Sequence, residues 1–216
     1  MISETQEVAV IGAGGHGKVV IGLLQELGFK VSMILDDDPR KWGTRILSVP
    51  VKGPVKDLVR TQASRAIIGI GENRTRLQVA KDNEGLHWIT AVHPYSWVHP
   101  SVKVGEGSVV FAGCVIQPDT IIGKHCIINT GATIDHDCRI ADGVHIAPGS
   151  HLAGNIVIEE GSFLGVGVSV IPGCSIGKGV TIGAGATVTG DIQDLVVAVG
   201  TPARPIRSLI LGRGEG

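Results

Sequence analysis

The sequence predicts a small α/β domain of the βαβ type followed by a β-solenoid, and two observations lead to this fold class. Residues 6–93 alternate apolar runs of strand length with segments of helical spacing. From Val98 to Val188, every sixth residue is aliphatic without one interruption. A period of six matches neither the 3.6-residue turn of a helix nor the two-residue alternation of a strand, but it is typical of short straight faces joined by tight turns.

The first part of the chain is expected to form a parallel sheet with covering helices. Strands are predicted at 8–11, 30–35 and 88–92, with a further buried strand and its polar tip in 66–74; helices are predicted at 15–27 and 74–84. This is about half of a full dinucleotide-binding domain, which pairs two such units. The expected division is a nucleotide-binding domain at 1–93, a solenoid at 94–195 and a C-terminal cap or tail at 196–216.

The repeat fixes which residues point into the solenoid. The sixteen aliphatic positions are Val98, Val104, Val110, Ile116, Ile122, Ile128, Ile134, Ile140, Ile146, Leu152, Ile158, Leu164, Val170, Ile176, Ile182 and Val188. Small or β-branched residues follow four positions later, and all four cysteines (Cys114, Cys126, Cys138 and Cys174) fall there. We expect free core thiols rather than disulfides or a metal site, because there is no C-x-x-C pair and a cytoplasmic chain keeps its thiols reduced.

A G-x-G-x-x-G motif at Gly12, Gly14 and Gly17 follows the first predicted strand. Such a turn brings a helix N-terminus up to a phosphate, and it serves NAD, FAD, nucleotide sugars or plain strand-to-helix packing alike. Asp36 lies at about the distance expected of a ribose-binding acid, so the motif alone leaves these ligands open.

The net charge and the hydropathy of the chain limit the classes of partner that it is expected to bind. The formal net charge is −1 and no Lys/Arg run occurs, which disfavours binding to nucleic acid or to a membrane surface. The first residues lack the features of a signal peptide, and no stretch approaches the roughly 20 apolar residues of a membrane span. We expect a cytoplasmic protein with small-molecule partners.

Five further stretches, taken with the hexads, resemble one enzyme family. They are "GAGGHGKVV" (12–20), "LDDD" (35–38), "IGIGEN" (68–73), "NTGATIDHDC" (129–138) and "VGTPAR" (199–204). The combination resembles the NeuD/PglD-type sugar acetyltransferases of the hexapeptide-repeat superfamily. The resemblance implies a Rossmann-like N-terminal domain that binds a nucleotide sugar, a left-handed parallel β-helix, and a homotrimer that binds acetyl-CoA between subunits.

The resemblance also assigns candidate site residues. His136 corresponds to the general base, with Asp137 as its partner, and the hexad register independently places His136 on the outside of a coil. The expected substrate contacts are Gly14, Gly15, His16, Asp36, Asp37 and Gly71; the expected acetyl-CoA contacts are His145, Gly154, Gly165, Val166 and Ala184. No metal is expected. His125 and His151 carry no motif and are interpreted as surface residues.

The function that the resemblance implies is acetyl-CoA-dependent N-acetylation of a nucleotide-linked amino sugar, such as a UDP- or GDP-4-amino-4,6-dideoxyhexose. Three alternatives stay open: O-acetylation of a sialic acid or similar sugar, a catalytically silent binding or assembly protein, and an NAD-dependent oxidoreductase. The oxidoreductase would need a nicotinamide-binding second half, which a solenoid does not offer. A serine acetyltransferase would be expected to carry a helical N-terminal domain.

Overall fold

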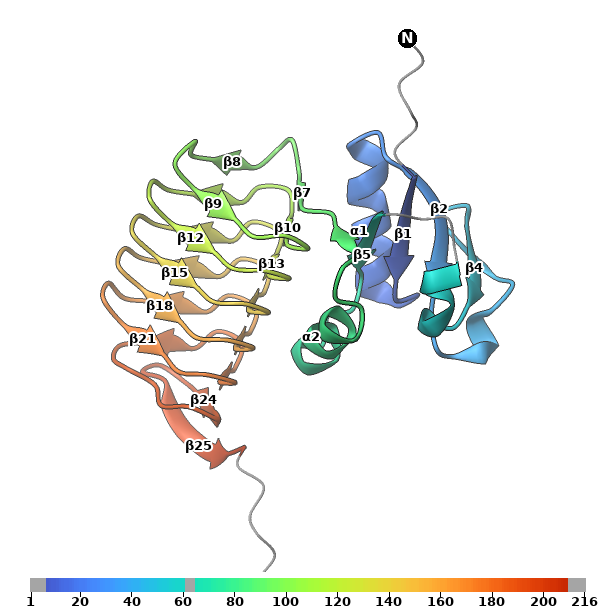
Figure 1. Cartoon of the computed structure of the whole chain (residues 1–216). Coiled ribbons are helices and arrows are strands. Elements are labelled where there is room, and N and C mark those ends of the chain that lie inside the picture. The colour runs from blue at the N-terminus through green and yellow to red at the C-terminus, as the bar shows by residue number, and fades with distance from the viewer. Residues whose placement is uncertain (1–6, 61–64, 210–216) are drawn as a thin grey trace, which may run out of the picture.

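The computed structural model describes residues 7–60 and 65–209, and in it a β-helix stands beside an α/β sheet (Figure 1). The last residues of the predicted tail, 210–216, lie outside the described range. The division at 93/94 and 195/196 stays a proposal. No helix within the described ranges is long and apolar enough to cross a membrane.

The α/β unit is a six-stranded sheet in the order β3-β4-β2-β1-β5-β6. Its strands are β1 (Glu7–Ile11), β2 (Lys30–Leu35), β3 (Arg45–Ile46), β4 (Val49–Gly53), β5 (Arg65–Ile68) and β6 (His87–Trp88). Its helices are α1 (Gly15–Glu26) and α2 (Asn73–Asp82), with 3₁₀ turns η1 (Pro39–Lys41) and η2 (Val55–Arg60). All neighbouring strands are parallel except β3 and β4.

This strand order creates a switch point beside β1. The chain leaves β1 toward β2 and β4 on one side and then returns to β5 on the other side of β1. Parallel α/β sheets bind ligands at the carboxyl ends of the strands at such a point. The residues that directly follow β1 and β5 are therefore in the position to form a binding site.

The β-helix has three faces of parallel strands, except that the last strand of the first face, β25, pairs antiparallel with β24. The first face holds β7 (Ala91–Val92), β10 (Val109–Val110), β13 (Ile127–Ile128), β16 (His145–Ile146), β19 (Phe163–Leu164), β22 (Thr181–Ile182), β24 (Val196–Val199) and β25 (Arg204–Ser208). The second face holds β8 (Trp97–Val98), β11 (Val115–Ile116), β14 (Thr133–Ile134), β17 (His151–Leu152), β20 (Ser169–Val170) and β23 (Thr187–Val188). The third face holds β9 (Lys103–Val104), β12 (Ile121–Ile122), β15 (Arg139–Ile140), β18 (Val157–Ile158) and β21 (Ser175–Ile176).

The hexad prediction is confirmed residue by residue. Each of the sixteen predicted aliphatics is the second residue of a two-residue strand, and all except the half-buried Val98 and Val104 are buried. Strands pair with a shift of 18 residues, as in Ile128 beside Ile146, so three hexads complete one coil. The stacked aliphatic rows form the core of the β-helix.

The predicted strand at 88–92 is wrong, because two strands in different sheets occupy this stretch. β6 ends the α/β sheet at Trp88, whereas β7 begins the first face of the β-helix. Val92 lies six residues before Val98 and has the same phase, so the hexad register extends one repeat before Val98. Val92 is half-buried, like Val98 and Val104 in the next two hexads.

The four cysteines are buried free thiols, as predicted. Burial raises the pKa of Cys114 and Cys126 to about 11, so both stay protonated near neutral pH. Their position in the core, and the absence of a thiolate, make them packing residues rather than nucleophiles.

Helix α2 joins the two units, and it lies between them in Figure 1. Asn73 donates through Nδ2 to the carbonyl oxygens of Gly161 (2.9 Å) and Ser162 (3.0 Å) on the β-helix. A Cβ on Gly143 would lie 2.6 Å from Cδ1 of Leu77, so this glycine lets the helix approach the coil closely. The joint is therefore specific, with polar and apolar contacts from one helix.

His125 belongs to this joint, and its interpretation as a surface residue is wrong. Its side chain is buried, with its ring centroid 5.2 Å from that of Trp88 in an edge-on arrangement. The hexad pattern places His125 at a turn, but it says nothing of the second domain that covers this turn. His151 is exposed on the second face, as expected.

Candidate active site

A cavity of about 440 Å³ lies at the carboxyl ends of β1, β2 and β5, at the switch point. All six predicted substrate residues line it: Gly14, Gly15, His16, Asp36, Asp37 and Gly71. The structure thus brings together residues from three separate motifs of the sequence. Lys41 and Glu72 also line this cavity, and the sequence analysis did not select them.

The glycines after β1 divide into two groups. Gly12 has a φ of +107°, and a Cβ on Gly17 would collide with the carbonyl oxygen of Gly12. These two glycines therefore allow α1 to pack closely against the strand end. In contrast, a Cβ on Gly14 or Gly15 would meet no atom within 4 Å, so packing does not explain why glycine stands at these two positions.

The N-terminus of α1 opens toward this cavity. Gly14 is its N-cap and provides no side-chain hydrogen bond, and no acidic side chain occupies the first turn. The first backbone N–H groups of a helix lack partners within the helix and attract anions. A phosphate group at Gly14 and Gly15 would satisfy them.

The two aspartates after β2 shape the cavity wall. Asp36 Oδ2 accepts from the backbone N–H of Ala13 (2.7 Å) and from Lys41 Nζ (2.9 Å), while Asp37 Oδ1 accepts from the N–H of Val55 (2.8 Å). Burial raises the pKa of Asp36, but these hydrogen bonds outweigh burial and leave the pKa below its ordinary value. Both carboxylates hold neighbouring loops in place, and each keeps oxygen lone pairs for a ligand.

His16 and His145 meet at the boundary between the two units, with ring centroids 6.2 Å apart. Burial, and then the charge of Arg76, lower the pKa of each to about 4, so both are neutral near pH 7. His145 Nδ1 lies 3.3 Å from the carbonyl oxygen of Gly71, which can only accept. Nδ1 therefore carries the proton, and Nε2 accepts from Asn129 Nδ2 at 3.2 Å.

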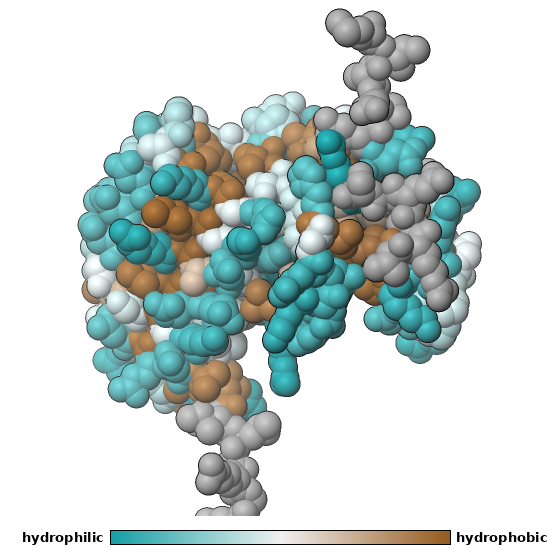
Figure 2. Space-filling view, in the orientation of Figure 1, coloured by the Kyte–Doolittle hydropathy of each residue, from teal (hydrophilic) through white to brown (hydrophobic). Residues whose placement is uncertain are grey.

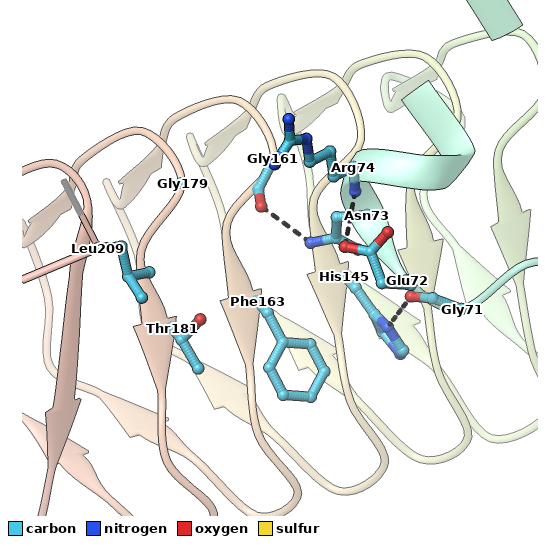
Figure 3. A pocket seen from close by; sticks show the side chains of 10 residues that line it. All are labelled: Gly71, Glu72, Asn73, Arg74, His145, Gly161, Phe163, Gly179, Thr181 and Leu209. Atoms are coloured by element: carbon cyan, nitrogen blue, oxygen red, sulfur yellow. Dashed lines mark hydrogen bonds between the residues drawn. The ribbon is translucent and has the colours of Figure 1, made fainter. Parts of the chain in front are cut away.

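A second cavity, of about 720 Å³, lies between α2 and the first face of the β-helix (Figure 3). It is lined by Gly71, Glu72, Asn73, Arg74, His145, Gly161, Phe163, Gly179, Thr181 and Leu209. Gly71 and Glu72 line both cavities, so the two spaces meet at this turn.

The sequence contained a signal for part of this second cavity. His145, Phe163 and Thr181 are separated by 18 residues and stack on the first face through parallel pairing. In Figure 3 the side chains of Phe163 and His145 project from neighbouring strands into the same space. A search at intervals of one full coil would have grouped them.

His136 lies in the turn between β14 and β15, at the corner where the second and third faces meet. Its Nδ1 is 2.7 Å from Asp137 Oδ2, and about half of each side chain is exposed. The hydrogen bond that Nδ1 donates to the Asp137 carboxylate raises the pKa of His136. With Nδ1 bonded to a carboxylate, Nε2 of an exposed ring is free to accept a proton from a ligand.

The predicted coenzyme residues occupy three places in one chain. Gly154 lies buried at the His136 corner; Gly165, Val166 and Ala184 lie at the opposite corner of the second face; His145 lies on the first face beside Gly71. Gly165 is also buried, and a Cβ there would lie 2.7 Å from the backbone nitrogen of Ala184. One chain alone therefore does not bring this set together. Within the described residues no group of His, Cys, Asp and Glu side chains is arranged to hold a metal ion.

Comparison with known proteins identifies the family. Residues 7–82 match the family described as the PglD N-terminal domain, and three segments within 101–190 match the bacterial transferase hexapeptide repeat. The structure resembles that of perosamine N-acetyltransferase from Caulobacter crescentus in complex with CoA and GDP-perosamine, with 43% identity and a TM-score of 0.88 over 94% of this chain and 97% of that one. The chain belongs to the NeuD/PglD-type sugar acetyltransferases.

Two further relatives of NeuD/PglD type agree. The acetyltransferase domain of PglB from Neisseria gonorrhoeae is 39% identical, with a TM-score of 0.88 over 93% of this chain and 100% of that one. UDP-N-acetylbacillosamine N-acetyltransferase from Bacillus subtilis is 40% identical over 123 residues, which are 50% of this chain and 52% of that protein. The chain spans at most about half of the length of the curated relatives it matches. The β-helix is left-handed, as the resemblance implied.

Proposed function

We propose that this protein is an acetyl-CoA-dependent N-acetyltransferase that acts on a nucleotide-linked amino sugar, such as a UDP- or GDP-4-amino-4,6-dideoxyhexose. The observation that carries the proposal is the exposed pair of His136 and Asp137, 2.7 Å apart, in a chain whose other unit holds a 440 Å³ cavity at the carboxyl ends of its strands. The printed activities of the Caulobacter and Bacillus relatives support the same reaction class.

His136 acts as the general base in this proposal. The sugar amine attacks the thioester carbonyl carbon of acetyl-CoA, a C–N bond forms, and the amine proton passes to Nε2 of His136. The tetrahedral oxyanion is held by backbone N–H groups; when it collapses, the C–S bond breaks and the imidazolium returns the proton to the sulfur of CoA. Asp137 stabilises the imidazolium and fixes the ring orientation.

The nucleotide sugar occupies the 440 Å³ cavity in this proposal. The N–H groups at Gly14 and Gly15 bind its diphosphate, and Asp36 and Asp37 accept hydrogen bonds from the ribose or the base. His16 and Gly71 lie where the cavity meets the β-helix, so they contact the sugar end.

The active form is proposed to be a homotrimer. Within one chain, His136 and the pair Val166 and Ala184 lie at opposite corners of the second face, so a neighbouring subunit must bring a coenzyme bound at one corner to a base at the other. His145, Gly154 and Gly165 complete the proposed coenzyme set, with the buried glycines contributing backbone only.

The exposed apolar surface of the β-helix supports this assembly. Val166 and Trp97 are 56% and 50% exposed, and Figure 2 shows apolar surface along the β-helix among polar side chains. Light scattering in solution should give three times the chain mass of 22.4 kDa.

Because acetyl-CoA and nucleotide sugars are cytoplasmic metabolites, we place the protein in the cytoplasm.

The proposal is tested by offering acetyl-CoA with UDP- and GDP-linked amino sugars, their hydroxyl analogues, and free or CMP-linked sialic acid, while thiol release is followed. The expected result is release with an amino sugar and a mass increase of one acetyl group on its nitrogen. Release with only a hydroxyl acceptor would replace the proposal by O-acetylation. The absence of release with every acceptor would favour a binding protein.

A further inference from the structure

The guanidinium of Arg76 is the most completely buried charge among the described residues, with 1% of the residue exposed. All five of its N–H donors can be assigned to oxygen acceptors. Nε donates to His125 O (2.8 Å), Nη1 to Ile70 O and Gly71 O (both 3.1 Å), and Nη2 to Asn73 Oδ1 and Gly143 O (both 2.8 Å). No carboxylate takes part in this set, so four main-chain carbonyls and one amide hold the ion.

These acceptors come from both structural units. Ile70 and Gly71 belong to the turn after β5 and line the nucleotide cavity, whereas His125 and Gly143 belong to two successive coils of the β-helix. The rigid, planar guanidinium of Arg76 therefore connects the turn that lines the cavity to the β-helix. Its contact with Gly143 lies in the coil that contains His145. A buried ion without a paired carboxylate is costly, so plain domain packing is a poor explanation for it.

The carbonyl oxygen of Gly71 connects Arg76 with the residues that line the two cavities. It accepts from Arg76 Nη1 and lies 3.3 Å from His145 Nδ1, so the guanidinium and the imidazole share one acceptor. Gly71 lines both cavities, and a Cβ on it would lie 3.7 Å from Cβ of His16. A shift of this turn would thus move the wall of the nucleotide cavity and the anchor of His145 together.

Resting on the proposed function, we propose that Arg76 is a positioning residue: it sets the Ile70–Gly71 turn against the β-helix and so aligns the nucleotide sugar with the acetyl-transfer face. Its side chain lines neither cavity. Its charge, buried behind the turn, also favours an anion in a cavity whose acidic lining residues, Asp36, Asp37 and Glu72, outnumber its basic one, Lys41.

The test compares Arg76→Lys with the control Lys81→Gln, which changes a cation on the same helix whose exposed side chain lines neither cavity. Lysine keeps the charge but offers only three donors from one point, so it cannot reach all five acceptors. Both full-length variants are measured at a temperature at which thermal unfolding shows them folded. The measurements are binding of UDP and GDP, binding of acetyl-CoA, and kcat with the amino sugar that the parent accepts.

We expect Arg76→Lys to weaken nucleoside diphosphate binding about tenfold and to lower kcat by a similar factor. Acetyl-CoA binding should weaken by less than about threefold, because His145 is the one proposed coenzyme residue that is anchored at this turn. Lys81→Gln should match the parent in all measurements. Unchanged diphosphate binding in Arg76→Lys, or an equal loss for both ligands in proportion to unfolded protein, would overturn the inference. The binding comparison judges the role of Arg76 even if the parent transfers no acetyl group, so it is separable from the proposed function.

A second variant, Asn73→Ala, keeps Arg76. It removes one acceptor of the guanidinium and the two hydrogen bonds to Gly161 and Ser162. It loosens the same joint from its other side. A selective loss of diphosphate affinity, smaller than that of Arg76→Lys, supports the inference, and an affinity equal to that of the parent contradicts it.

Discussion

The imidazole of His136 lies directly against Gly154, which occupies the equivalent turn position one coil later. A Cβ on Gly154 would lie 2.6 Å from Cε1 and 2.7 Å from Nε2 of His136, well inside van der Waals contact. The glycine therefore leaves the space that the proposed base occupies. Since the sequence pattern connects Gly154 to the coenzyme only by resemblance, this contact gives it a second, geometric reason to be glycine.

Gly154→Ala should displace the His136 ring and lower kcat by about 10- to 100-fold, because a misplacement of about 1 Å is enough for such a loss. The matched control is Gly190→Ala, where a Cβ meets no atom within 4 Å and φ is not left-handed. Turnover and thermal unfolding are measured for both. Equal turnover in the two variants would show that the contact has no role in catalysis.

Asp137→Asn should shift the pH dependence of kcat to lower pH. The pKa of His136 is raised mainly by its hydrogen bond with Asp137, and only the neutral imidazole can accept a proton, so the rate rises as pH passes upward through this pKa. Without the carboxylate the pKa falls, and the rising limb moves with it. Asparagine is chosen because residue 137 has a φ of +59°, which asparagine tolerates. An unmoved limb would remove Asp137 from the mechanism.

Gly15→Ala and Gly17→Ala should separate the ligand-facing glycines from the packing glycines. Gly15 lines the 440 Å³ cavity, and a methyl group there meets no protein atom within 4 Å. Binding of UDP or GDP should therefore weaken, while the free energy of unfolding rises by about 0.5–1 kcal/mol. At position 17 the methyl group collides with Gly12, and the domain should be strongly destabilised. Titration calorimetry and urea unfolding measure the two effects; unchanged diphosphate affinity in Gly15→Ala would contradict the proposed phosphate site.

Acidification should destabilise the protein between about pH 6.5 and 4. His16 and His145 have folded-state pKa values lowered to about 4 from 6.5, mainly by burial. In this range the unfolded chain binds protons at both imidazoles and the folded protein does not, so the free energy of unfolding falls as pH falls. Urea unfolding at several pH values should show a shallower fall for His145→Gln than for the parent. The control is His87→Gln at an exposed position, and an equal slope in all three proteins would contradict the assignment.

The β-helix was predictable almost completely from the sequence, because its period of six is a local property that each coil repeats. The same register placed His136 outside a coil and the cysteines inside. The strand at Val92 was not separated from β6, because the apolar residues of 88–92 follow one another without a turn signal although they enter two different sheets.

The contacts between the two units could not be predicted in this way. Arg76 and Asn73 lie on a polar helix whose sequence resembles a solvated surface, and His125 lies at an ordinary turn; each is buried only because the other unit covers it. The proximity of His16 to His145 depends on the same docking. Distances across a domain boundary are set by tertiary packing. Hexad phase and strand periodicity describe only local structure, so they do not predict these distances.

The most direct test of the central claim is acetyl transfer by the parent and by His136→Ala, each supplied with acetyl-CoA and the nucleotide amino sugar that the parent accepts. General-base catalysis contributes about 10²- to 10⁴-fold, so we expect kcat to fall by that factor in His136→Ala while diphosphate and acetyl-CoA binding stay close to those of the parent. Turnover in His136→Ala equal to that of the parent would contradict the account, because the proton of the amine would then have another acceptor.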